Sequence, residues 1–264
     1  MFDIHYHLLY GLDDGPKTLE DSIALAEASV AEGTTHIVAT PHSNYRYKFD
    51  PEVNRQRLEE LSAAFDGRLT LGLGCDMHLT YENVQEAIRD PKKFSINGGR
   101  YVLVEFADSS LPRQMDDTLF QLRLAGIVPI ITHPERNPML MSAPNRLADW
   151  VQKGCVVQVT AASLTGRFGP KSQKLAENWI AANWVHLLAS DAHGVKWRSP
   201  SMGEGYEAAK TKFSAVTADR LCIQNPKAIF YNQQLPPQPE PEQVGAPGPG
   251  LGFFKRLFGG SGPD

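Results

Sequence analysis

The sequence has few cysteines, no long apolar run and no excess of positive charge, and each absence excludes a class of protein. Its three cysteines are an odd number without CxxC spacing, which argues against a disulfide framework and favours a reducing compartment, so we expect a cytoplasmic protein. Nowhere do about 18 apolar residues follow one another, and no basic segment precedes an apolar run, so we expect neither a membrane span nor an export signal. The net charge is -4, whereas a nucleic-acid-binding domain is usually basic, so we expect no nucleic-acid partner.

Two missing motifs exclude common hydrolytic routes. The nucleophile loop of thiol phosphatases has an arginine six residues after its cysteine, but here those positions hold Tyr81, Ala161 and Ala228. The GxSxG elbow of serine hydrolases is also missing from the sequence. We therefore predict that the cysteines are core residues.

Apolar runs rich in strand-forming residues alternate with amphipathic segments along most of the chain. The amphipathic segment 18–32 starts with a capping pattern and is followed by Gly33, which is typical of a helix. Continuous apolar strands between helices indicate a buried parallel sheet, and about seven repeats without GxGxxG favour a (β/α) barrel over a doubly wound sheet. The seven runs are FDIHYH, THIVAT, LTLGLGCDM, YVLVEF, VPIITH, CVVQVT and WVHLLAS.

The composition changes after Asn232. We predict one catalytic domain over residues 1–232, because the proline-rich segment 233–250 cannot form a core and is typical of an extended linker. The segment 251–264, LGFFKRLFGGSGPD, is predicted to be a short amphipathic or disordered tail. Its apolar residues around a Lys-Arg pair suggest a partner contact or a peripheral membrane contact.

Metal-ligating residue types gather where the predicted strands end. Two histidines spaced by two residues are a weak signal alone, but six of the seven runs end in such residues. In a barrel these ends meet on the one face that carries active sites. The residues are His5, His7, His42, Asp76, Glu105, His133, Asp191 and His193. The other three histidines, His36, His78 and His186, are expected to be structural.

Imidazole and carboxylate donors without thiolates suit Mn, Fe or Zn, and eight or nine donors imply two or three ions. Such a site favours metal-assisted hydrolysis of a phosphoester. Arg136 and Arg198 follow His133 and His193 on loops over the same barrel mouth, where they would bind phosphate oxygens. The alternative is that each arginine pairs with a loop carboxylate such as Glu135.

The motifs together resemble the PHP (polymerase and histidinol phosphatase) superfamily. They are Asp3-x-His5-x-His7, Asp13-Asp14-Gly15-Pro16, Thr40-Pro41-His42, Glu105-Phe106, His133-Pro134-Glu135-Arg136 and Ser190-Asp191-x-His193. The DDGPK, HPER and SDAH segments look like those of the bacterial metal-dependent protein-tyrosine phosphatases of capsule and exopolysaccharide clusters.

The resemblance implies a distorted (β/α)7 barrel with a trinuclear site. The first metal would take His5, His7, Asp76 and Asp191; the second would share Asp76 and take Glu105 and His133; the third would take Asp14, His42 and His193. Asp13 is an equally good sequence candidate for the role of Asp14. Because the family often has Glu where Asp76 stands, the bridging role of this shorter side chain is open.

The implied reaction is attack of a metal-activated hydroxide on phosphotyrosine, with Arg136 and Arg198 on the phosphate and with His42 or a water assisting the leaving group. The implied substrate is a bacterial tyrosine autokinase that controls polysaccharide export, and manganese is the first candidate metal. Whether the chain forms an oligomer is left open. Another PHP phosphoesterase, acting on histidinol phosphate or nucleotides, is the alternative. A catalytically silent docking protein that uses FFKRLF is a third hypothesis.

Overall fold

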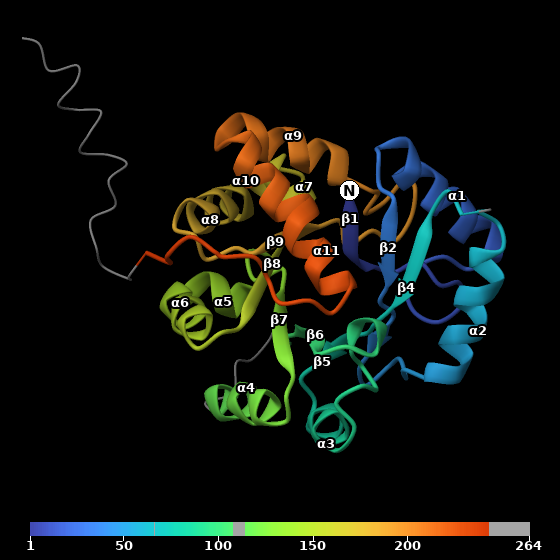
Figure 1. Cartoon of the computed structure of the whole chain (residues 1–264), viewed down its shortest axis with the longest axis horizontal. Coiled ribbons are helices and arrows are strands. Elements are labelled where there is room, and N and C mark those ends of the chain that lie inside the picture. The colour runs from blue at the N-terminus through green and yellow to red at the C-terminus, as the bar shows by residue number, and fades with distance from the viewer. Residues whose placement is uncertain (66, 108–113, 243–264) are drawn as a thin grey trace, which may run out of the picture.

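The fold is built on parallel strands, and the computed structural model describes residues 1–65, 67–107 and 114–242 (Figure 1). Three strands pair in the order β1-β2-β4 and six in the order β3-β5-β6-β7-β8-β9, with every pairing parallel. The strands are β1 Phe2–Tyr6, β2 His36–Ala39, β3 His42–Ser43, β4 Thr70–Leu73, β5 Asp76–His78, β6 Tyr101–Glu105, β7 Val128–Thr132, β8 Val156–Thr160 and β9 Leu187–Ala189.

The two sheets are parts of one ring. Strand β3 follows β2 after only two residues, and β5 follows β4 after two, so these pairs are single strands with a break. The ring is closed at Tyr6, which forms a parallel bridge with Ala192 after β9. The His7 amide donates to the Ala192 carbonyl at 3.0 Å, and the Asp191 amide donates to the His5 carbonyl at 3.0 Å. With β2/β3 and β4/β5 each counted once, the ring has seven strands, and few hydrogen bonds close it. This arrangement confirms the expected distorted (β/α)7 barrel.

Helices surround the strands, as Figure 1 shows. The predicted helix 18–32 is α1 (Leu19–Ala31), with Thr18 and Asp21 forming a capping box and Gly33 following in the left-handed region. The other helices are α2 Pro51–Ser62, α3 Tyr81–Arg89, α4 Met115–Leu124, α5 Pro138–Ser142, α6 Pro144–Gln152, α7 Ala161–Leu164, α8 Gly169–Ala181, α9 Met202–Lys212, α10 Ala215–Asp219 and α11 Asn225–Phe230, with short turns η1 Ile96–Gly98 and η2 Arg220–Gln224.

Alternation along the strands separates an apolar from a polar end of the barrel. On β6 Leu103 precedes Glu105 by two positions, and on β8 Val156 precedes Gln158 by two, so each pair shares a face. Leu103 and Val156 belong to one buried apolar cluster, together with Ile130 of β7. The polar members lie one step closer to the carboxyl ends of the strands, which is where barrel active sites are built. All three cysteines are buried and free, as predicted.

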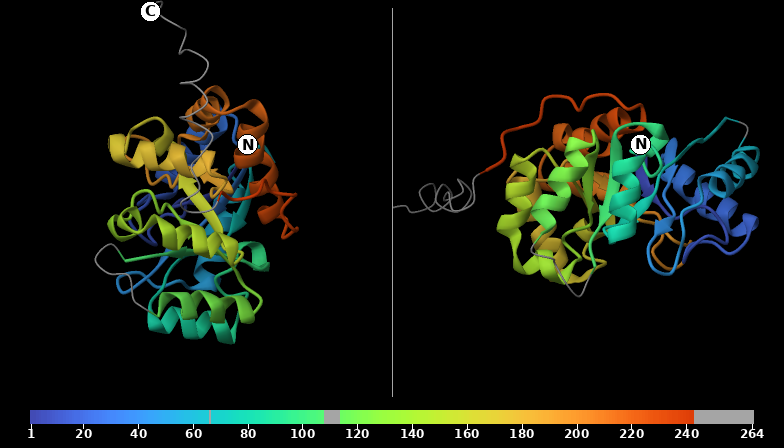
Figure 2. Two further views of the ribbon diagram at one scale, coloured as in Figure 1. Left: turned by 90° about the vertical axis from the view of Figure 1, so that its left-hand side faces the viewer. Right: turned by 90° about the horizontal axis from the view of Figure 1, so that it is seen from below.

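The first part of the predicted linker lies against the domain. Residues 233–242 are extended and run from the end of α11 to the end of α8 (Figures 1 and 2). Tyr101 donates its hydroxyl to the Gln233 carbonyl at 2.8 Å, and Trp184 donates its indole N–H to the Glu242 carbonyl at 2.9 Å. Residues 243–250 and the predicted tail 251–264 lie outside the described residues, and the domain boundary stays a prediction.

Candidate metal centre

All nine predicted metal ligands lie together at the carboxyl ends of the strands. They fall into four overlapping groups whose ligand atoms lie within 4.8 Å of one another in each group. The groups are His5, His7 and Asp76; His5, His133 and Asp191; His7, Asp14, His42 and His193; and His42, Asp76, His78 and Glu105. Only the last group contains a residue that was expected to be structural, His78.

The first two groups surround a common centre. His5 Nε2 lies 3.6 Å from Asp76 Oδ2 and 3.4 Å from Asp191 Oδ1, and His7 Nε2 lies 3.4 Å from the same Asp191 oxygen. Donors about 2.1 Å from one ion in a tetrahedron would lie about 3.4 Å apart. The spacing therefore fits an ion among these side chains.

The other donors extend the centre to both sides. His133 Nε2 lies 3.6 Å from Glu105 Oε1, and His42 Nδ1 lies 3.0 Å from Asp76 Oδ2. On the opposite side, Asp14 Oδ1 lies 3.5 Å from His42 Nε2 and 3.4 Å from His193 Nε2. The donor atoms thus form one continuous constellation and not separate pairs.

Many of these buried atoms have no hydrogen bond within the described part of the chain. Buried polar atoms are normally hydrogen-bonded, so a concentration of unpaired ones at one point is typical of a cation-binding site. The unpaired atoms are His42 Nδ1, both carboxylate oxygens of Asp76, Glu105 Oε2, Asp191 Oδ1 and His193 Nε2. This donor set fits divalent metal ions.

The DDGP turn shows which aspartate faces the centre. Asp13 is buried, and its Oδ2 lies 2.7 Å from His7 Nδ1 and accepts the His42 amide at 3.1 Å. The turn passes so close to His7 that a Cβ at Gly15 would lie 2.6 Å from the His7 carbonyl oxygen. Asp13 therefore orients His7, whereas Asp14 presents its carboxylate to His42 and His193.

A similar contact orients His5. Its Nδ1 lies 2.9 Å from Gln158 Oε1, an oxygen that can only accept, so Nδ1 carries the proton and Nε2 is left as a donor for a metal. Gln158 is fully buried on β8. No spacing in the sequence linked Gln158 to the site, because the contact joins residues 153 positions apart.

Both predicted phosphate-binding arginines lie at the centre. Arg136 and Arg198 each contact Asp191 Oδ2, and the Arg136 guanidinium also lies 4.3 Å from the ring centre of Phe168. Each arginine therefore does pair with a carboxylate, as the alternative had it, but that carboxylate is Asp191 and not Glu135. Glu135 Oε1 accepts the Thr160 amide at 3.0 Å and the Ser163 hydroxyl at 2.7 Å instead.

Charge compensation keeps the Asp191 carboxylate ionised. Burial alone would raise the pKa of Asp191, but Arg198, His5 and Arg136 hold it well below its usual value. Burial would likewise lower the pKa of His5, but Asp76 and Asp191 raise it to about 9. Bound divalent cations would replace the proton that this negative potential attracts to His5.

Of the three histidines expected to be structural, two lie outside the centre. His36 stacks on Phe2 with a ring separation of 4.0 Å, and His186 accepts the Val157 amide at 3.2 Å. His78 instead contacts Glu105 Oε2, so its placement apart from the site was wrong. The spacing Asp76-x-His78, which matches His5-x-His7, was the sequence signal that could have found it.

A family model described as capsular polysaccharide synthesis, CpsB/CapC, matches residues 1–231. The chain belongs to this family. Within the CpsB/CapC family, the tyrosine-protein phosphatase YwqE of Bacillus subtilis is 34% identical over 246 residues, which cover 90% of this chain and 96% of the relative. The tyrosine-protein phosphatase CpsB of Streptococcus pneumoniae is 30% identical over 244 residues, covering 89% of this chain and 100% of the relative.

Solved structures agree with the CpsB/CapC assignment. A chain from crystal structures of YwqE and CpsB, described as unique metal-dependent tyrosine phosphatases, superimposes with a TM-score of 0.86 and 32% identity, covering 92% of this chain and 99% of that chain. The phosphotriesterase from Mycobacterium tuberculosis matches with a TM-score of 0.56 at 12% identity, covering 89% and 95%, which shows a shared fold alone. Among the described residues, no helix is both long and apolar enough to span a membrane.

Proposed function

We propose that this chain is a metal-dependent protein-tyrosine phosphatase. The observation that carries the proposal is the set of unpaired buried donor atoms beside Arg136 and Arg198 at one barrel mouth. A cation site next to fixed guanidinium groups suits a phosphate ester, whose charge both would neutralise. The names of the relatives, tyrosine-protein phosphatases, support phosphotyrosine as the substrate.

The donors would hold two or three divalent ions, with Mn the first candidate and Fe or Zn the alternatives. His5, His7, Asp76 and Asp191 would bind the first ion. Asp76, Glu105 and His133 would bind the second ion, and Asp14, His42 and His193 the third. When bound, such ions supply Lewis-acid stabilisation of phosphoryl oxygens and a lowered pKa for attacking water.

The two arginines hold the phosphate in this proposal. Asp191 fixes both guanidinium groups, and Arg198 Nε is buried without a hydrogen-bond partner among the described residues. That free N–H, with the remaining ones of Arg136, would donate to the equatorial oxygens as negative charge develops. The leaving tyrosinate oxygen would take its proton from a metal-bound water, or from His42, whose side chain is 11% exposed, in any state in which His42 does not bind an ion.

The proposed physiological substrate is the phosphotyrosine-bearing segment of a bacterial tyrosine autokinase that controls capsule or exopolysaccharide export. The family's description, capsular polysaccharide synthesis, supports it. Three buried free cysteines suit the reducing cytoplasm, which we propose as the location. A partner or peripheral membrane contact of residues 251–264 remains part of the proposal.

The test is turnover of a phosphotyrosyl peptide by the purified full chain. We expect turnover that a chelator abolishes and Mn²⁺ restores, and that is lost in the His5→Ala, His7→Ala double variant. Histidinol phosphate and nucleoside monophosphates, measured in parallel, should give kcat/KM values at least about tenfold lower. Full activity of the double variant would sink the proposal. Preference for a small phosphomonoester would replace it with the PHP phosphoesterase alternative.

A further inference from the structure

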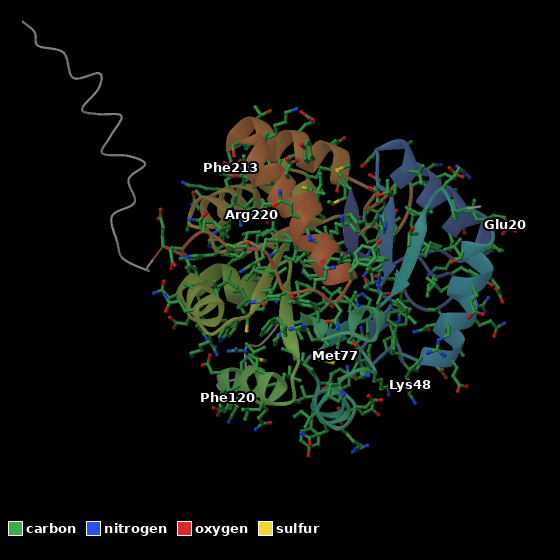
Figure 3. All side chains as sticks on the ribbon, viewed as in Figure 1. Glu20, Lys48, Met77, Phe120, Phe213 and Arg220 are labelled. Carbon is green, nitrogen blue, oxygen red and sulfur yellow. The ribbon has the colours of Figure 1, made fainter. Side chains whose placement is uncertain are left out.

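His78 lies beside Glu105 because of strand register. Strands β5 and β6 run parallel, with Asp76 opposite Leu103 and His78 opposite Glu105. Side chains two positions apart on a strand share a face, so Asp76 and His78 project to the same side of β5. Met77 between them, labelled in Figure 3, packs into the apolar cluster that also contains Val84 of α3.

The four side chains in this part of the centre share a small volume. His78 Nε2 contacts Glu105 Oε2, and that same oxygen lies 3.5 Å from His42 Nδ1. His42 Nδ1 in turn lies 3.0 Å from Asp76 Oδ2, and one ligand atom from each of the four residues lies within 4.8 Å of the others. With His133, which is proposed for the same ion and lies 3.6 Å from Glu105 Oε1, His78 would give the Asp76 and Glu105 carboxylates two imidazole partners. Two imidazoles and two carboxylates match the number and type of donors that a four-coordinate divalent ion takes.

The hydrogen bonds of these residues do not account for the arrangement. Both oxygens of Asp76 and Oε2 of Glu105 are buried without a hydrogen-bond partner within the described residues. Burial of unpaired carboxylate oxygens is costly unless a cation lies against them. The side chain of His78 is 25% exposed, which leaves this edge of the centre accessible to an entering ion.

We infer that His78 is a metal ligand that donates an imidazole nitrogen to an ion held by Asp76 and Glu105. This inference rests on the proposed metal dependence and adds a donor to the nine assigned above. The competing interpretation is that His78 only forms an ion pair with Glu105 at the rim of the barrel. The substitution His78→Gln separates the two interpretations, because an amide donates a hydrogen bond but is a poor metal ligand. The variant would keep a hydrogen bond to Glu105 and lose the coordination of an ion.

The experiment is a titration of metal-free full-length protein with Mn²⁺ alone, read by isothermal titration and by the electron paramagnetic resonance signal of free Mn²⁺. His78→Gln is compared with wild type and with His36→Gln, which removes a histidine at the other end of the barrel. In His78→Gln we expect one class of site to weaken by at least about tenfold, because even residues that only orient ligands change metal affinity by 10–100-fold. His36→Gln should bind as wild type does.

If every class of Mn²⁺ site kept its affinity in His78→Gln, the inference would be overturned. His78 would then only form an ion pair with Glu105. Equal weakening of all classes would also overturn it, because that result reports a general distortion of the strand ends. Circular dichroism and thermal unfolding in chelator verify folding, and His78→Ala serves as a second variant if the glutamine protein does not fold. Since no turnover is measured, absence of phosphotyrosine hydrolysis would count against the proposed function without affecting this result.

Discussion

The Nδ1 atom of His7 lies 2.7 Å from Oδ2 of Asp13, so the first aspartate of the DDGP turn orients an imidazole. The second, Asp14, directs its carboxylate toward His193 instead, with Oδ1 3.4 Å from Nε2. We therefore propose separate roles for two adjacent aspartates: Asp13 orients a metal ligand, and Asp14 is itself a metal ligand. Substitution should distinguish them.

We expect Asp13→Asn to weaken metal binding about 10–100-fold while leaving activity at saturating metal largely intact, because His7 keeps its donor atom and loses only its orientation. Asp14→Asn should stay impaired at every metal concentration, since a donor is lost. Activity measured across a Mn²⁺ titration checks both. If excess metal restored the activity of Asp14→Asn but not that of Asp13→Asn, the two roles would have to be exchanged.

The arginines at Asp191 give a second prediction. Arg136→Lys and Arg198→Lys should each lower kcat/KM for a phosphotyrosyl peptide by a factor on the order of 10² or more, because lysine cannot present the planar pair of N–H donors. Arg146→Lys, which changes a partly exposed arginine paired with Asp116 on the outer helices, is the matched control and should be neutral. Equal kcat/KM for all three variants would show that neither guanidinium binds the phosphate.

Removal of metal should destabilise the fold as well as stop turnover. The centre brings carboxylates and imidazoles from six strand positions into one buried volume, so ions that bind the folded state alone stabilise it. At a free metal concentration 100 times the dissociation constant, the gain is about 2.7 kcal/mol per site. Thermal unfolding with Mn²⁺ and with chelator measures it, and an identical transition in both would contradict the prediction.

His186 predicts a pH dependence that is independent of the metal centre. Burial, and then Arg220, lower the pKa of His186 from 6.5 to about 4, and its Nδ1 accepts the Val157 amide and must be unprotonated to do so. The unfolded chain binds this proton near pH 6.5 and the folded chain only near pH 4. The contribution of neutral His186 to stability is therefore present above pH 6.5 and lost as the pH falls from 6.5 to 4.

The check is the free energy of unfolding in urea, with chelator present, at pH 7.5 and pH 4.5. Between these two values, wild type should lose about 2 to 3 kcal/mol more than His186→Asn, whose amide oxygen takes the position of Nδ1 and can still accept the Val157 N–H. Other titrating groups change both proteins alike, so they cancel in the difference. Equal losses would mean that His186 is not held neutral by the fold.

Much of the centre followed from the sequence because of one geometric rule. Parallel strands in a barrel present their carboxyl ends on a single face, so residues that follow apolar runs meet there however far apart they lie in the chain. His5, Asp76 and Asp191 could be placed together for this reason without any knowledge of their contacts. The same rule put Arg136 and Arg198 at the same mouth.

The rule failed where the direction of one side chain mattered. His78 was expected to be structural, yet it lies two positions after Asp76 on the same strand and opposite Glu105 of β6. The partner of Arg136 was also beyond reach, since Glu135 is next to it in sequence but Asp191, 55 positions away, makes the contact.

By itself, the sequence determined the barrel, the face that carries the chemistry and the donor types, because strand period, helix period and ligand chemistry are local properties of a chain. Only the tertiary structure decided which atoms face one another: Asp13 on His7 and Asp14 on His193, Gln158 behind His5, and His78 against Glu105. Those pairings depend on strand register and turn geometry. Packing of the whole barrel fixes both, and no stretch of neighbouring residues specifies either.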